Sequence, residues 1–83
     1  MHARSLLSPV LAHDAAGGDI LMTVRTYLAA NCNPHRAARE LHCHVNTIRY
    51  RLRTFEALMG WGLADYDTRL KIDLACRILD LPS

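Results

Sequence analysis

The sequence predicts an all-α fold: one domain, residues 1–83, built as a small bundle of about five helices. Three observations indicate this class. Apolar residues recur at three- and four-residue spacing, which is the period of a helix with one buried face. Leucine and alanine are abundant, whereas the chain has only 4 glycines and 3 prolines. Asparagine and aspartate residues that can cap helices precede the apolar runs.

The first two predicted helices lie between residues 4 and 31. Residues 4–13 favour a short helix, although Pro9 lies inside it, and its apolar stripe consists of Leu6, Leu7, Val10 and Leu11. Residues 14–18 break this pattern, and the Asp19 carboxylate is expected to cap a second helix that reaches about Asn31. The residues it is expected to bury are Leu21, Val24, Tyr27 and Leu28.

The segment from about residue 33 to 60 is predicted to form a helix-turn-helix. Asn33 followed by Pro34 indicates a capped start for a helix over residues 34–42, since the missing proline N–H has no partner in a first turn. After a connection at 42–44, a longer helix is predicted over residues 45–59, ended by Gly60 in a left-handed conformation. Its expected core face consists of Val45, Ile48, Leu52, Phe55 and Met59.

A last helix is predicted from a cap at Asp65 to about Leu81, with Pro82 just beyond its end. The residues expected on its inner side are Leu70, Leu74, Ile78 and Leu81.

Positive charge is concentrated in the helix-turn-helix segment. The formal net charge of the whole chain is only +2, but residues 36–53 hold five arginines and one acid, for +4, which leaves −2 for the remainder. A local excess of this kind is what a phosphate-binding surface requires. The sequence therefore points to double-stranded DNA as a partner.

The outer face of the helix 45–59 carries side chains suited to reading DNA. An arginine can bond guanine with two hydrogen bonds, an asparagine can do so with adenine, and hydroxyl groups can bond phosphate oxygens. An arginine-rich face alone is equally typical of a solvated surface. The helix predicted just before it completes a helix-turn-helix, and this favours DNA binding. The face consists of Asn46, Arg49, Tyr50 and Arg53, with Thr47 at its edge; Arg36 belongs to the same basic stretch, and His44 either donates to a phosphate or closes the turn.

Longer stretches resemble a known family. The spacing Ala37-Ala38-x2-Leu41-x5-Thr47-Ile48-x3-Leu52 is similar to the general bacterial helix-turn-helix pattern. The run from Asn33 to Leu52, with His44, Asn46-Thr47-Ile48 and Tyr50-Arg51-Leu52, resembles the C-terminal DNA-binding domain of PucR/CdaR transcriptional regulators. Residues 21–28 and 67–78 agree with the same family. Val45 departs from it, since the family usually has arginine there.

The resemblance implies a fold akin to the factor-for-inversion-stimulation type, self-association as a homodimer, and an effector-responsive region upstream that lies outside these 83 residues. A small-molecule effector would therefore act only through that upstream region. Arg51 matches the family motif but falls near the buried side of the helix. We therefore expect its stem to pack against a neighbour while its head reaches phosphate.

The sequence offers three other kinds of function. A zinc site would draw on Cys32, His35, His42, Cys43 and His44, but no second ligand pair recurs at matching spacing, so no metal or cofactor is expected. No nucleophile or acid–base pair stands out, so the chain is not expected to be an enzyme. A helical protein-interaction or dimerisation module without direct DNA readout remains the alternative.

Cysteine usage and hydropathy indicate a cytoplasmic protein without a membrane span. Three cysteines at irregular spacing fit free thiols in a reducing compartment, with Cys43 and Cys76 as small core residues. No apolar stretch approaches the roughly 20 residues needed to cross a bilayer.

Overall fold

The structure, a computed structural model, describes residues 3–80, which form six helices and no strand. In chain order they are α1 (Ala3–Leu6), α2 (Ser8–Ala15), α3 (Ile20–Ala29), α4 (Pro34–Glu40), α5 (Val45–Met59) and α6 (Tyr66–Asp80). The predicted all-α class is confirmed.

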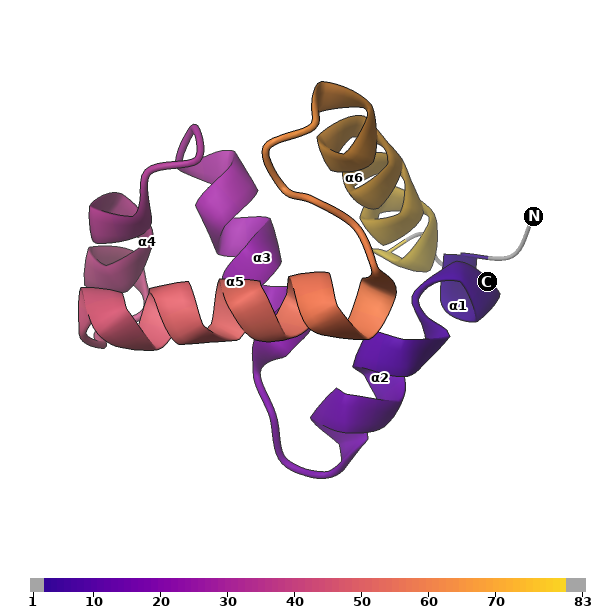
Figure 1. Ribbon diagram of the computed structural model, residues 1–83, viewed down its shortest axis with the longest axis horizontal. Coiled ribbons are helices and arrows are strands. Elements are labelled where there is room, and N and C mark those ends of the chain that lie inside the picture. Colours follow the sequence, from indigo (N-terminus) through magenta and orange to yellow (C-terminus); the bar gives the residue numbers. More distant parts are fainter. Residues whose placement is uncertain (1–2, 81–83) are drawn as a thin grey trace.

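The long helix α5 crosses the domain, and the other helices gather around it and α3 (Figure 1). At one end α4 packs against both α3 and α5, and at the other end α2 does the same. The last helix, α6, packs against α1 and α3. The core lies between these elements, and its largest fully buried side chains include Phe55, Leu7, Ile48, Ile72 and Val24.

The core face of α5 is the one predicted from the sequence. Ile48, Leu52 and Phe55 are buried, and Val45 and Met59 at the two ends of the stripe are half-buried. The rings of Phe55 and Trp61 also meet edge to face, with centroids 6.4 Å apart. These contacts fix which side of α5 is turned outward.

The prediction of one helix over residues 4–13 is wrong, because the chain forms two helices with a turn at Leu7. Pro9 lies in the first turn of α2, where its missing N–H has no helical partner in any case. A continuous helix would have required Pro9 to donate to the carbonyl of Ser5. The break lets the Leu7 side chain turn fully into the core.

The N-terminus of α3 is capped by Asp14 and not by Asp19 as predicted. The Asp19 side chain makes no capping bond, whereas the Asp14 carboxylate accepts from the backbone N–H groups of Ile20 at 2.8 Å and Leu21 at 3.0 Å. Gly17, with φ of +108°, reverses the chain and brings Asp14 to this position.

Helix α3 is also shorter than predicted and buries a different set of side chains. It ends at Ala29 because Asn31 and Cys32 adopt left-handed conformations, with φ of 57° and 60°. Of the residues predicted to be buried, Val24 is buried and the other three are half-buried; Ile20 and Thr23 join Val24 in the core.

The expected inner side of α6 is wrong. Leu70, Leu74 and Ile78 are 45%, 52% and 54% exposed, and Leu81 lies outside the described residues. The side chains that α6 buries are Thr68, Ile72, Ala75 and Cys76. Ala75 and Cys76 are small, which allows α6 to approach its neighbours closely. The cap at Asp65 is present, since its carboxylate accepts from the backbone N–H of Asp67 at 3.1 Å.

Candidate nucleic-acid interface

Helices α4 and α5 form the predicted helix-turn-helix. The Asn33 side-chain oxygen accepts from the backbone N–H groups of His35 at 3.0 Å and Arg36 at 3.2 Å, so α4 is capped as expected. Helix α4 ends at Glu40, two residues before its predicted end. Buried Ala37 and Ala38 allow α5 to pack closely on α4.

The bounds of α5 are those predicted, Val45–Met59. Gly60 ends it with φ of 70°, in the left-handed region that glycine adopts without a Cβ penalty, and its N–H donates to the carbonyl of Glu56 at 2.8 Å. The helix therefore presents four turns of regular backbone beyond the turn at residues 41–44.

Four of the predicted DNA-contacting residues share the exposed side of α5. Asn46, Arg49, Tyr50 and Arg53 are all exposed, and they lie opposite the buried stripe at about 100° per residue. Thr47 is half-buried at the edge of this face. We call these five residues the outer face of α5.

The acidic residue of α5 is turned away from the outer face. The Glu56 carboxylate accepts from the backbone N–H of Leu63 at 2.8 Å and so holds the segment that follows the helix. The ion pairs found within residues 3–80 are Arg25–Asp80 and Arg77–Asp73, on α3 and α6. In the described part of the chain, the arginines of the outer face are therefore not neutralised by an acid.

His44 caps α5. Its Nδ1 accepts from the backbone N–H of Asn46 at 3.0 Å, which requires that Nδ1 carry no proton. In the neutral ring the proton then sits on Nε2, which remains a donor at the N-terminal end of the outer face. His44 thus closes the turn, which is one of its two predicted roles. Its Nε2–H stays available for the other role, donation to a phosphate, which remains a prediction.

The family of the PucR C-terminal helix-turn-helix domain matches residues 20–78, which include α3 to α5 and most of α6. The chain belongs to this family. The PucR-type domain is a helix-turn-helix DNA-binding domain of transcription regulators, and the predicted family is confirmed.

Two relatives of this chain are named as regulatory proteins. The chain is 38% identical over 64 residues to the purine catabolism regulatory protein of Bacillus subtilis (strain 168), and the match covers 77% of this chain and 12% of that protein. It is 34% identical over 56 residues to the proline-responsive transcriptional activator PutR of the same organism, covering 68% of this chain and 14% of that protein.

A third relative, an uncharacterized protein from the pkwA 5′ region of Thermomonospora curvata, is 33% identical over 70 residues, covering 84% of this chain and 39% of that protein. The chain thus spans less than two fifths of the length of each of these relatives. No solved structure matches it. The named relatives are regulators, and no enzyme is among them.

The remaining predicted site residues are divided between the surface and the interior of the PucR-type domain. Arg36 is exposed on α4, and so is Arg39, which the sequence placed in the basic stretch but not in the site. Arg51 is half-buried, and its Nη1 donates to the Thr23 hydroxyl on α3 at 3.3 Å. The expected packing of Arg51 is therefore present, and its contact with phosphate remains a prediction.

A hollow of about 480 Å³ beside the outer face was not predicted. It is lined on the α5 side by Asn46, Thr47 and Tyr50, among others, and on the other side by the loop between α2 and α3. His13 near the end of α2 and Gly17 and Gly18 of this loop are far from α5 in sequence. Only the packing of α2 and α3 against α5 brings them there, so no local signal could have revealed them.

The zinc alternative finds no support in the described residues. Histidines 35, 42 and 44 line one shallow surface with Cys43, yet no three potential ligands in residues 3–80 stand close enough to hold a metal ion. Cys76 is buried in the core, as predicted, while Cys43 and Cys32 are partly exposed. None of the helices in the described range has the length and apolarity to cross a membrane.

Proposed function

We propose that this domain binds double-stranded DNA sequence-specifically, with α5 in the major groove, as the C-terminal domain of a bacterial-type transcriptional regulator. The observation that carries the proposal is the outer face of α5, which groups exposed hydrogen-bonding side chains without an acid. A major groove about 12 Å wide admits one helix, which reads base edges from its N-terminal half. Asn46, Arg49 and Tyr50 lie in that half, and Arg53 follows about one turn after Arg49.

Each side chain then has a chemical role. Arg49 and Arg53 can each give two hydrogen bonds to a guanine, and Asn46 can do the same with an adenine. The hydroxyl groups of Tyr50 and Thr47 can reach phosphates. Further phosphate contacts come from the Nε2–H of His44, from Arg36 on α4, and from the guanidinium nitrogens of Arg51 that Thr23 does not engage.

We further propose that the domain binds as a homodimer in the cytoplasm and that a small-molecule effector acts through an upstream region. Two-fold related recognition helices must lie roughly 34 Å apart to enter successive major grooves. The domain measures 34 × 28 × 26 Å, so two copies side by side can meet this spacing. One relative is named as a proline-responsive transcriptional activator, which supports effector-dependent regulation.

A salt series tests DNA binding. Affinity of the 83-residue chain for a pool of labelled duplexes is measured at increasing salt, for the unaltered chain, the Arg49→Ala/Arg53→Ala double variant and a Lys71→Ala control. Each phosphate contact that is lost reduces the slope of log affinity against log salt by about 1. Each lost base contact weakens specific binding by about 1–3 kcal/mol.

The expected result is a steep salt dependence for the unaltered chain and the control, with a weaker and shallower response for the double variant. Lys71 is an apt control because it is an exposed cation on α6, with its Nζ 5.0 Å from the centre of the Trp61 ring. Equal affinities for all three proteins would remove α5 from the interface. Absence of binding at low salt would favour the interaction-module alternative, for which the exposed apolar side of α6 is the supporting observation.

A further inference from the structure

The exposed side of α6 carries an apolar stripe that the single chain leaves uncovered. Tyr66, Leu70, Leu74 and Ile78 follow one another at four-residue spacing and are 66%, 45%, 52% and 54% exposed. At this spacing they share one side of the helix. Apolar patches of about 300–600 Å² on a monomer often mark interaction sites, and four large side chains in a row make a patch of that order.

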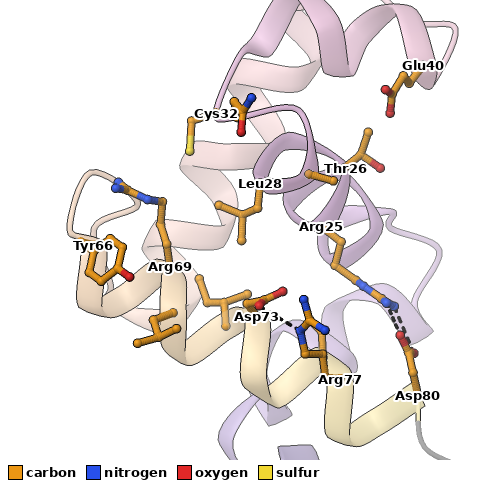
Figure 2. Close-up of a pocket in the computed structure, with 15 residues that line it drawn as sticks. Arg25, Thr26, Leu28, Cys32, Glu40, Tyr66, Arg69, Asp73, Arg77 and Asp80 are labelled. Atoms are coloured by element: carbon orange, nitrogen blue, oxygen red, sulfur yellow. Dashed lines mark hydrogen bonds and ion pairs between the residues drawn. The ribbon is translucent and has the colours of Figure 1, made fainter.

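The stripe borders a groove between α3 and α6, with a volume of about 940 Å³ (Figure 2). Its apolar lining includes Leu28, Leu70 and Ile72. Its charged lining is balanced, with three arginines and three acids: Arg25, Arg69, Arg77, Glu40, Asp73 and Asp80. Unlike the outer face of α5, this surface has no excess of positive charge to attract a polyanion.

We propose that this face joins two copies of the chain, with their α6 helices packed antiparallel across a two-fold axis near Leu74. The inference rests on the dimeric DNA binding proposed above and assigns the surface that makes the dimer. In this register Leu74 meets the partner's Leu74, and Leu70 meets the partner's Ile78. Each apolar side chain of this central set is then covered by another, as an isologous interface requires.

The charges beside the stripe suit this partner. Asp73 and Arg77 are four residues apart on the side of α6 that borders the groove, and their side chains are 50% and 74% exposed. With the axis at Leu74, Arg77 lies within about 3 Å, along the helix direction, of the partner's Asp73. The contact repeats in reverse, so the surface is complementary to itself. Antiparallel helices also place opposite ends of their macrodipoles together.

The proposed dimer leaves DNA binding unobstructed. The groove beside the stripe is lined by residues of α3, α4, α6 and the loop after α3, and no residue of α5 is among them. In Figure 1 α6 lies to one side of α5, and the two helices do not pack against each other. Both recognition helices of a dimer therefore remain exposed.

Sedimentation velocity over a concentration series tests the surface. We expect the unaltered 83-residue chain to dimerise and Leu74→Asp to weaken the dimer by about thirtyfold or more, the effect of losing a central hot-spot residue. Leu74 is 52% exposed in the single chain, so the variant should still fold, and circular dichroism should show an unchanged helix content. Tyr50→Asp is the matched control: it removes an apolar side chain that is 58% exposed on the outer face of α5, and it should weaken DNA binding while the dimer persists.

Cysteine cross-linking tests the antiparallel arrangement in a Cys32→Ser/Cys43→Ser background. Leu74→Cys should form a covalent dimer on mild oxidation, whereas Tyr66→Cys should not, because antiparallel packing places the two copies of position 66 roughly 24 Å apart along the helices. A chain that stays monomeric at all concentrations, or a Leu74→Asp dimer as tight as the original, would overturn the inference. Neither result bears on the salt series, so the dimer inference and the proposed DNA binding can fail separately.

Discussion

Replacing Leu52 by alanine removes three carbon atoms from the core beneath α5. Leu52 is 9% exposed and belongs to the same buried cluster as Ile48, Phe55 and Ala38. At about 0.8 kcal/mol per buried methylene, the lost transfer free energy alone is about 2.4 kcal/mol. The cavity left behind adds to this loss, which gives a total of about 2–5 kcal/mol. The small residual exposure of Leu52 favours the lower half of that range.

Thermal unfolding followed by circular dichroism measures this loss. For a domain of this size, 1 kcal/mol corresponds to about 4–8 °C, so the melting temperature should fall by at least about 8 °C. Arg53→Ala is the matched control, because Arg53 is the exposed neighbour of Leu52 and alanine is a good helix former. Equal melting temperatures for Leu52→Ala and the original chain would show that the face assigned to the core, and with it the outer face, is wrong.

Three further predictions concern single side chains. His44→Ala should lower the free energy of unfolding by about 0.5–2 kcal/mol, measured by urea unfolding, because the α5 cap is lost. His44→Asn keeps a cap, so it should weaken only DNA binding, measured by titration with duplex DNA. Asp14→Ala should cost about 1–2 kcal/mol, more than Asp19→Ala, because Asp14 holds two N–H groups of α3; the reverse order in urea unfolding would contradict this. Burial raises the pKa of the Cys76 thiol above its ordinary value of 9.0. The unfolded chain therefore loses this proton first, and the free energy of unfolding should fall above pH 9.0. Cys76→Ala should lessen that fall, and an identical pH profile for the variant would refute the assignment.

The helix-turn-helix was predictable because its determinants are local. Asn33 and Pro34 start α4, Gly60 ends α5, and the buried stripe of α5 alternates with a polar face over four turns. Each signal acts within a few residues, so it can be recognised without knowledge of the neighbours. The same locality allowed Asn46, Arg49, Tyr50 and Arg53 to be placed together.

Caps supplied from a distance were not predictable in this way. Asp19 stands at the usual capping position of α3, yet Asp14, six residues before Ile20, provides the bonds. The difference depends on how α2 and α3 meet through Gly17, which is a matter of packing and not of local propensity. Arg51 is similar, since its bond to Thr23 joins residues 28 positions apart.

The sequence by itself determined the helical class, the family, the bounds of α5 and the face that it turns outward. Only the tertiary structure decided which side of α6 is buried. Leu70, Leu74 and Ile78 are the larger apolar residues, but Ala75 and Cys76 fit the close approach to the helices that α6 packs against, while Ile72 fills the core. Hydropathy ranks side chains by the free energy of exposing them to water. Packing also selects them by shape and by the space that neighbouring helices leave.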